Sequence, residues 1–395
     1  MLATWVSNLG DGMALAAGPL LVASQTRDPF LVAAAAFVQR LPLVLFGLYA
    51  GALADRLNRK MLVVSADLAR VGLLVLLVTF IGTGHVTIWV VLAVLFALGV
   101  FETMADTTGP TLVPMLVASE DLGVANSRLL GGYITGNQLI GPPVGAFLFA
   151  AGMVWSFVAQ AVLVLAGALI LVRVSLPSLP PTKETSHLRR DIGEGIGWLV
   201  RHPAMRTLAL VIVTFNVTFG AAWSVLVLYA QDRLSLGHVG FGLLTTVSAV
   251  GGLVGTAGYG WLERRFSLGD IMRVGLIWET VSHALLAVTT QAWVAMVIFF
   301  VFGAHAFIWG TTSQTVRQRA IPAELQGRVG SAYMIAMFGG LLVGQVIGGV
   351  VASHWGIVAP FWFGFAGSAL ILVAIWRQLP QIAHDTGVAT DTAAH

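Results

Sequence analysis

Cysteine is absent from this 395-residue chain, and charged residues are scarce, at 10% of the sequence. Without cysteine there can be no structural disulfide, no thiolate metal site and no thiol-based redox chemistry. A soluble domain usually carries about 25% charged residues. Because hydrophobic residues make up 57% of the chain, the composition excludes a soluble protein and indicates a membrane protein.

Motifs for catalysis and for ATP hydrolysis are also missing. The chain has no HExxH, no Walker loop and no cysteine nucleophile, so we expect no enzyme and no ATP-driven pump. The formal charge of +3 does not indicate nucleic acid, because the basic residues fall in short loops between apolar segments. We expect no nucleic-acid partner, no metal and no cofactor.

Twelve apolar stretches are each long enough to cross a bilayer, whose hydrocarbon layer of roughly 30 Å needs about 20 helical residues. The predicted spans are 2–23, 30–54, 61–82, 87–107, 129–150, 154–174, 206–230, 240–262, 270–290, 292–312, 329–353 and 357–376. Seventeen of the 21 Lys and Arg residues lie in one set of loops, and only Arg27 and Arg233 lie in the other. Since positive charge favours the cytoplasmic side, we expect both termini in the cytoplasm.

One long connector, rich in proline and charge, divides the spans six and six. We therefore expect an N-terminal six-helix bundle at 1–174, a cytoplasmic linker at 175–205, a C-terminal six-helix bundle at 206–378 and a disordered cytoplasmic tail at 379–395. Gly51 and Arg56 recur in the second half as Gly260 and Arg265, a weak repeat of a six-span unit. Repeated halves suit a transporter in which one half rocks against the other.

The segment GALADRLNRK, at residues 51–60, lies in the short loop between the second and third predicted spans. It matches the motif G-x-L-a-D-r-x-G-r-k at Gly51, Asp55, Arg56, Arg59 and Lys60, and on these residues the chain resembles the major facilitator superfamily. Asn58 stands at the second glycine of the motif, where we expect it to be tolerated in a left-handed turn. The resemblance implies an all-α membrane fold of twelve helices in two pseudo-symmetric six-helix bundles. It also implies that this loop gates the cytoplasmic side.

Two further segments narrow the resemblance. GPPVG, with Gly141, Pro142 and Gly145, looks like a signature of drug-extruding antiporters in this superfamily. The segment at 316–333 is similar to one subgroup, which contains macrolide-efflux proteins and the enterobactin exporter. The resemblance implies a monomer in the bacterial inner membrane that exports a drug, macrolide or siderophore type of molecule by proton antiport with alternating access. A proton-coupled uptake symporter and a non-transporting sensor or scaffold remain alternatives.

Charged residues inside the predicted spans are the candidate coupling sites, because each needs a partner or a wet cavity. Asp11 and Arg40 each lie about ten residues into a span, at the same depth from opposite faces. We expect them to pair, with Asp11 exchanging its proton for substrate. The alternative is a permanent pair that holds the helices together.

A second group combines Asp67 and Arg70, three residues apart on one helix, with Glu102 and Asp106 of the next span. In this superfamily many proton antiporters carry an arginine in the fourth span, which this chain replaces with the two acids. Either Arg70 is shared and Glu102 carries a proton, or the group is a gate latch around Asp55.

In the second half, Glu279 and His305 complete the predicted charge network, with His283 four residues after Glu279. Imidazole titrates near physiological pH and suits a proton relay, whereas a histidine bonded to a backbone carbonyl is the plain alternative. Predicted substrate contacts are Asn216, Trp223 and Trp309, because the family resemblance places their spans around the cavity. Tryptophan in membranes also commonly packs or anchors at the interface.

Overall fold

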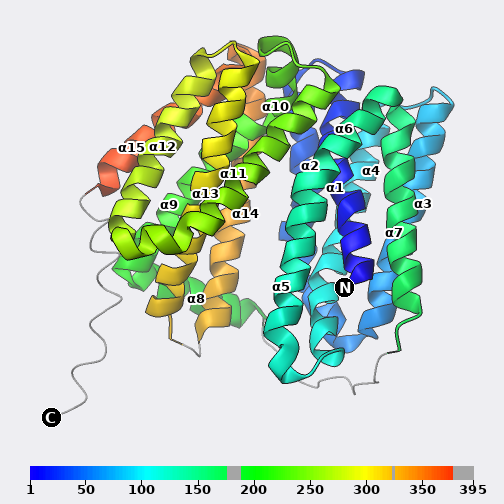
Figure 1. The fold of residues 1–395 in the computed structure, drawn as a ribbon, viewed down its shortest axis with the longest axis horizontal. Helices are drawn as coiled ribbons and strands as arrows, with labels where there is room; N and C mark the ends of the chain where they lie inside the picture. Colours follow the sequence, from blue (N-terminus) through cyan, green and yellow to red (C-terminus); the bar gives the residue numbers. More distant parts are fainter. Residues whose placement is uncertain (176–187, 323–324, 377–395) are drawn as a thin grey trace. The chain divides into compact units, whose positions relative to one another are not determined.

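The computed structural model describes residues 1–175, 188–322 and 325–376, and in these ranges every regular element is a helix. Figure 1 shows long helices running side by side within each half of the chain. Ten helices of the described part are long and apolar enough to cross a membrane. The chain is therefore a multi-pass membrane protein.

The first half contains five long helices and a broken one. The long helices are α1 (Leu2–Gln25), α2 (Pro29–Arg56), α3 (Arg59–Gly82), α4 (Ile88–Thr108) and α7 (Met153–Val172). Between α4 and α7 lie two 3₁₀ segments, η1 (Gly109–Met115) and η2 (Ser119–Asp121), and then α5 (Leu122–Tyr133), the π-helical η3 (Ile134–Ile140) and α6 (Gly141–Ala151). Asp28, Asn58 and Thr87 each cap a helix by accepting a hydrogen bond from a backbone N–H of its first turn.

The second half begins with α8 (Leu188–Arg201), a helix inside the segment predicted as a linker. It continues with α9 (Pro203–Ser224), the short α10 (Leu226–Leu228), the π-helical η4 (Tyr229–Arg233), α11 (His238–Arg265), α12 (Leu268–Val288), α13 (Ala292–Ala320), α14 (Gln326–Trp355) and α15 (Ala359–Ile375).

The predicted count of twelve spans is not confirmed. The stretch predicted as the fifth span is divided among α5, η3 and α6, because Pro142 and Pro143 cannot donate to an α-helical ladder. The stretch predicted as the twelfth span forms α15, whose 17 residues extend only about 25 Å. The remaining ten stretches each correspond to a helix of sufficient length and hydropathy.

Contacts divide the chain into two compact units, Met1–Glu184 with Val227–Thr246, and Thr185–Leu226 with Val247–His395. The beginning of α11 thus groups with the first unit and its remainder with the second. The predicted tail at 379–395 lies outside the described residues. The predicted boundaries of the two bundles stay a prediction.

Close helix packing in both units depends on glycine. In the second unit, a Cβ on Gly340, Gly344 or Gly348 of α14 would meet the backbone of α9, so these glycines let the two helices approach closely.

In the first unit, α1 packs against α5, η3, α6 and α7, while α2 and α3 both pack against α4.

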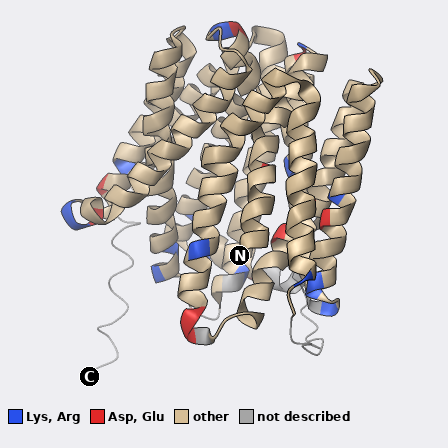
Figure 2. Ribbon diagram, turned by 45° about the vertical axis from the view of Figure 1, so that its right-hand side comes forward, with Lys and Arg blue, Asp and Glu red and all other residues tan. Residues whose placement is uncertain are grey.

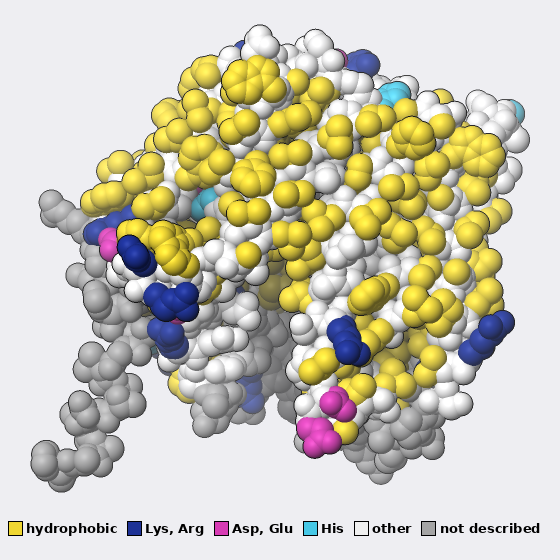
Figure 3. Space-filling model, viewed as in Figure 1, with side chains coloured by type: hydrophobic (Ala, Val, Ile, Leu, Met, Phe, Trp, Pro, Cys, Tyr) yellow, Lys and Arg dark blue, Asp and Glu magenta, His cyan; other side chains and the backbone are white. Residues whose placement is uncertain are grey.

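Charged residues are concentrated toward helix ends, and the lengths of the helices are mostly uncharged (Figure 2). Figure 3 shows hydrophobic side chains covering most of the described surface in view. This distribution suits helices whose outer faces contact hydrocarbon.

Candidate functional site

Arg70 of α3 is the centre of a buried charge cluster in the first unit. The residue is only 1% exposed, and its guanidinium forms ion pairs with Asp11 of α1 and Asp67 of its own helix. The Arg70 Nη1 to Asp67 Oδ1 distance is 3.1 Å. A guanidinium at this depth needs such partners, because an unpaired buried charge is very costly.

The predicted pair of Asp11 with Arg40 is wrong. Within the described residues Asp11 pairs with Arg70, and Arg40 is exposed on α2. Counting residues from a helix end gives depth in the membrane but not the direction in which a side chain points. The long side chain of Arg70 extends from α3 to α1, a contact that the positions of Asp11 and Arg70 along their spans did not indicate.

Two carboxyl groups of α4 add to the cluster. Glu102 and Asp106 both interact electrostatically with Arg70. Glu102 is half-buried and Asp106 is exposed. The residues that the sequence grouped on the third and fourth spans therefore share one cation, and Asp11 joins them.

The GPPVG segment contacts α1 directly beside Asp11. A Cβ on Gly141 would meet the backbone of Gly12, and a Cβ on Gly145 would meet the backbone of Met13. Pro142 is buried in the first turn of α6. The segment thus sets how closely α6 approaches the part of α1 that carries Asp11.

The first residues of the predicted gating motif, from Gly51 to Arg56, lie at the end of α2. A Cβ on Gly51 would stand 3.8 Å from Thr107 Cγ2 of α4, an ordinary contact distance. Arg56, the last residue of α2, is exposed. The side chain of Asp55 lies outside the described part of the structure.

Arg59 and Lys60 connect the ends of several helices in the first unit. Arg59 donates from Nε to the Ala54 carbonyl at 3.2 Å and from Nη1 to the Thr111 carbonyl at 3.4 Å. Lys60 Nζ donates to the carbonyls of Val172 and Val174, each at 2.7 Å. A cation at this position satisfies terminal carbonyls of α7 and complements its dipole.

Asn58 has a different role from the one that the sequence suggested. Its φ of −66° is not left-handed, and its side chain accepts a hydrogen bond from the Met61 N–H at 3.1 Å. Asn58 is therefore the N-cap of α3, a position that favours asparagine for its side-chain oxygen.

A second buried cluster joins Glu279 and His283 of α12 to His305 of α13. His283 Nδ1 lies 3.5 Å from Glu279 Oε1 and 2.8 Å from the Glu279 carbonyl, while His305 Nε2 lies 3.7 Å from Glu279 Oε2. Glu279 and His283 are each 1% exposed and His305 is 8% exposed. Neither carboxylate oxygen of Glu279 has a hydrogen-bond partner among the described residues.

Each imidazole of this cluster rests against a glycine. A Cβ on Gly275 of α12 would stand 2.8 Å from His305 Cε1, and a Cβ on Gly364 of α15 would collide with the ring of His283. The two glycines make room for the rings beside Glu279. They are functional candidates that the sequence analysis missed, because an isolated glycine in an apolar run carries no sign of its neighbour.

The predicted substrate contacts fall partly into one aromatic cluster of the second unit. Trp223 of α9 stacks on Phe219, with ring centroids 4.2 Å apart, and lies 5.0 Å from Phe302 of α13. Trp309 is buried, with its ring centroid 6.3 Å from that of His305.

Asn216 does not extend its amide toward the aromatic cluster. It donates from Nδ2 to the Ile212 carbonyl of its own helix at 2.8 Å.

The sequence analysis did not predict the phenylalanines of this cluster as substrate contacts, although their spacing indicates a shared helix face. Phe215, Phe219 and Trp223 recur every four residues on α9, so they share one helix face. Phe299 and Phe302 precede His305 at intervals of three on α13. Both rows could have been read from the sequence as one aromatic surface.

The chain resembles known exporters along almost its whole length. It is 27% identical over 404 residues to the multidrug efflux pump Tap of Mycolicibacterium fortuitum, covering 97% of this chain and 95% of the relative. It is 24% identical over 371 residues to macrolide efflux protein A of Streptococcus pyogenes, covering 89% and 87% of the two chains.

A solved structure shares the fold. The crystal structure of a point mutant of the nucleoside transporter NupG superposes with a TM-score of 0.75 at 11% identity, covering 95% of this chain and 98% of that chain. Residues 1–344 match the family described as Major Facilitator Superfamily. Since this match covers most of the sequence, the chain belongs to the major facilitator superfamily of transporters.

Proposed function

We propose that this transporter exports a small amphipathic or lipophilic molecule, of the drug, macrolide or siderophore type, in exchange for protons. The observation that carries the proposal is the Arg70 cluster, in which Asp11 and Asp67 pair with one buried cation and Glu102 and Asp106 of α4 interact with it electrostatically. The proposal includes alternating access by a monomer in a bacterial inner membrane, with both termini in the cytoplasm.

Charge balance in the cluster favours proton exchange. Asp11 and Asp67 are buried and share the single guanidinium of Arg70, while Glu102 and Asp106 of α4 add further negative charge near it. A proton on one of them lowers that charge, and Asp11 is the best carrier because it connects α1 to α3 through Arg70. Release of the proton then strengthens the attraction between α1 and Arg70.

The contacts of α1 connect this proton site to helix movement. Gly141 and Gly145 pack against Gly12 and Met13, the residues that follow Asp11. A change in the attraction between Asp11 and Arg70 therefore acts on the same part of α1 that contacts α6. Helices that pack through glycine in this way can slide past each other, because no side chains interlock at the contact.

The aromatic cluster supports a lipophilic substrate. Trp223, Phe219 and Phe302 offer stacked apolar faces, which suit aromatic and alkyl groups better than a sugar or a polyanion. The efflux pumps to which the chain is similar are named for drugs and macrolides, which agrees with this class. His305 lies at the edge of the cluster and links it to Glu279, a second candidate proton site.

Inverted membrane vesicles test the proposal. Respiration acidifies their lumen, and macrolides, siderophores and cationic dyes are added while a pH dye reports lumenal pH. We expect lumenal alkalinisation with at least one compound, its loss in Asp11→Asn, and its retention in Glu120→Gln, which removes an exposed carboxylate from the same unit.

Three results would contradict the proposal. Accumulation of a compound in right-side-out vesicles together with protons would indicate an uptake symporter. Movement of a compound without any proton flux would exclude antiport with protons. Failure of every compound to move, in protein that is folded and correctly inserted, would favour a sensor or scaffold.

A further inference from the structure

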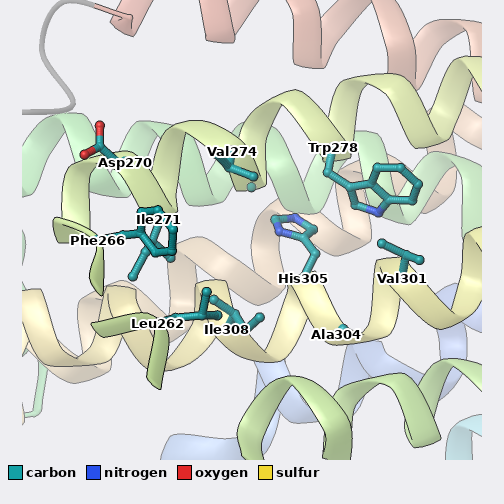
Figure 4. Close-up of a pocket in the computed structure, with 11 residues that line it drawn as sticks. Leu262, Phe266, Asp270, Ile271, Val274, Trp278, Val301, Ala304, His305 and Ile308 are labelled. Carbon is teal, nitrogen blue, oxygen red and sulfur yellow. The ribbon is translucent and has the colours of Figure 1, made fainter. Parts of the chain in front are cut away.

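A cavity of about 390 Å³ lies where α8, the start of α9 and the start of α14 meet in the second unit. Helix α8 packs against both of the other helices at this end of the unit (Figure 1). The cavity is lined by Glu194, Trp198 and Arg201 of α8, by His202 and by Leu325. It differs from the cavity in Figure 4, between α11, α12 and α13, whose lining is mostly hydrocarbon. Charged and polar groups around a volume within the range of about 300–1,000 Å³ that is typical of ligand sites indicate a polar ligand.

The cavity lies at the boundary between membrane and water. His202 immediately precedes Pro203, where the apolar helix α9 begins its span. On α8, Ile196 and Val200 are 47% and 51% exposed and lie four residues apart, so they form one apolar face. An apolar face on a helix at this boundary contacts lipid, and tryptophan, here Trp198, is enriched at the same level. A phospholipid can therefore reach the cavity with its headgroup while its chains follow α8.

The available charge in the cavity is positive. Arg201 is exposed, and its guanidinium has no partner among the described residues. Its Nη2 would stand 3.3 Å from a Cβ on Gly197, so this glycine leaves room for the guanidinium beside α8. The carboxylate of Glu194 is instead paired with Arg328 of α14, which compensates its charge. An anion in the cavity therefore meets an available guanidinium, and the acid beside it is already paired.

His202 supplies a second donor. Its ring stacks on Trp198, with centroids 5.0 Å apart and an interplanar angle of 23°, and this contact orients it. Nδ1 is buried and has no hydrogen-bond partner among the described residues, so Nε2 is the ring nitrogen that a ligand in the cavity can reach. A ring protonated on Nε2 donates from that atom, and a phosphate oxygen accepts. His202 is also the N-cap of α9, whose dipole places partial positive charge at this end.

Close packing fixes the two sides of the cavity. A Cβ on Gly195 of α8 would collide with the carbonyl of Arg328, so α8 and α14 touch through their backbones. We propose that the cavity binds the phosphate group of an anionic phospholipid, which Arg201 and His202 hold while the acyl chains lie along the apolar face of α8. Arginine suits this role because its planar guanidinium donates two parallel hydrogen bonds to phosphate. The lipid braces α8, α9 and α14 together, and the site requires neither a direction of transport nor a coupling ion.

Photochemical mapping on the full chain tests the site. The probe is phosphatidylglycerol with a diazirine next to its headgroup, added in small proportion to phosphatidylcholine nanodiscs that hold the purified protein. Mass spectrometry locates the adducts, which we expect within residues 194–202 and 325–328. Excess unlabelled phosphatidylglycerol should lower these adducts at least about tenfold, as expected when a charge-assisted contact is contested, whereas inorganic phosphate should leave them unchanged.

Two arginine variants separate this site from general attraction to anionic lipid. Arg201→Gln removes the guanidinium that lines the cavity, and since Arg201 is exposed the change leaves the core intact. Arg206→Gln removes an exposed arginine of the first turn of α9 that does not line the cavity. Loss of a charge-assisted hydrogen bond should lower the adducts about tenfold in Arg201→Gln, and Arg206→Gln should leave them unchanged.

Three outcomes would overturn the inference. Equal labelling by a phosphatidylcholine probe of the same design would show that the cavity does not select an anionic headgroup. Displacement by inorganic phosphate would assign the cavity to a soluble phosphate compound instead of a lipid. Equal losses in the two arginine variants would indicate general attraction to the charged end of the unit. Because labelling is measured without substrate or proton gradient, each of these results leaves proton-coupled export untouched, and loss of export would not explain a failure here.

Discussion

Replacing Arg70 by methionine should destabilise the first unit strongly. The substitution leaves Asp11 and Asp67, which are 8% and 5% exposed, without the cation that pairs with both. Removing one partner of a buried ion pair costs about 3–5 kcal/mol, because the remaining charge is uncompensated. We therefore expect Arg70→Met to lower the free energy of unfolding by about 3–5 kcal/mol.

The chain contains a matched control for this change. Arg273 also follows an aspartate by three residues, and its Nη1 lies 3.5 Å from Asp270 Oδ1, but the Asp270 side chain is 55% exposed. Exposed pairs contribute about 0–1 kcal/mol, so Arg273→Met should cost no more than that from the lost ion pair. Titration with SDS in mixed micelles, followed by circular dichroism, measures both free energies.

A double variant shows whether the buried charge is the cause. Asp11→Asn in the Arg70→Met background removes one uncompensated carboxylate, so the second change should restore part of the loss, with a coupling energy of about 0.5–3 kcal/mol. Equal costs for Arg70→Met and Arg273→Met, or strict additivity of the two changes in the cluster, would refute the argument from burial.

Three further changes can be measured in the same titration. Asn58→Ala should cost about 1 kcal/mol because the N-cap of α3 is lost, and Asn58→Ser should recover most of it; an equal loss with serine would contradict the cap. Gly344→Ala should cost about 1–3 kcal/mol, because its Cβ would meet the α9 backbone. Gly339→Ala is the control: a Cβ there meets nothing within 4 Å, so the change should raise the stability of the helix by up to about 1 kcal/mol. Similar effects of the two changes would contradict close packing at Gly344. Lys60→Met should cost about 1–3 kcal/mol and speed amide exchange in the last turn of α7, and unchanged exchange there would separate Lys60 from that helix end.

Helix positions followed closely from the sequence, because apolar length and polar breaks determine where a span can lie. The third span was predicted at 61–82, and α3 covers Arg59–Gly82. The fifth span was harder, since hydropathy does not register the change from α- to π-helical hydrogen bonding before Pro142. Helix α8 was also missed, because a polar segment between two prolines resembles a loop in composition.

Side-chain partners were less predictable than spans. The grouping of Asp67, Arg70, Glu102 and Asp106 could be expected because helical spacing and depth are both visible in the sequence. The pairing of Asp11 with Arg70 could not, because it depends on how α1 and α3 are rotated about their axes.

The cluster around Glu279 shows the same limit. His283 lies on the same helix and its proximity was visible as a spacing of four residues, whereas His305 comes from α13. Its ring reaches Glu279 across Gly275, and only the packed structure reveals that this glycine is needed.

The contact between Gly12 and Gly141 also limits how this chain can evolve. A side chain gained at Gly141 would occupy the backbone of Gly12, and one gained at Gly12 would occupy the backbone of Gly136 and Asn137 in η3, so neither mutation can be compensated by trimming a neighbouring side chain. Only a shift of α6 or η3 relative to α1 would accommodate it, and that shift would alter the surroundings of Asp11. We therefore expect lineages that keep an acid at position 11 to inherit the two glycines together, and lineages that lose one glycine to lose the acid or rebuild its partner.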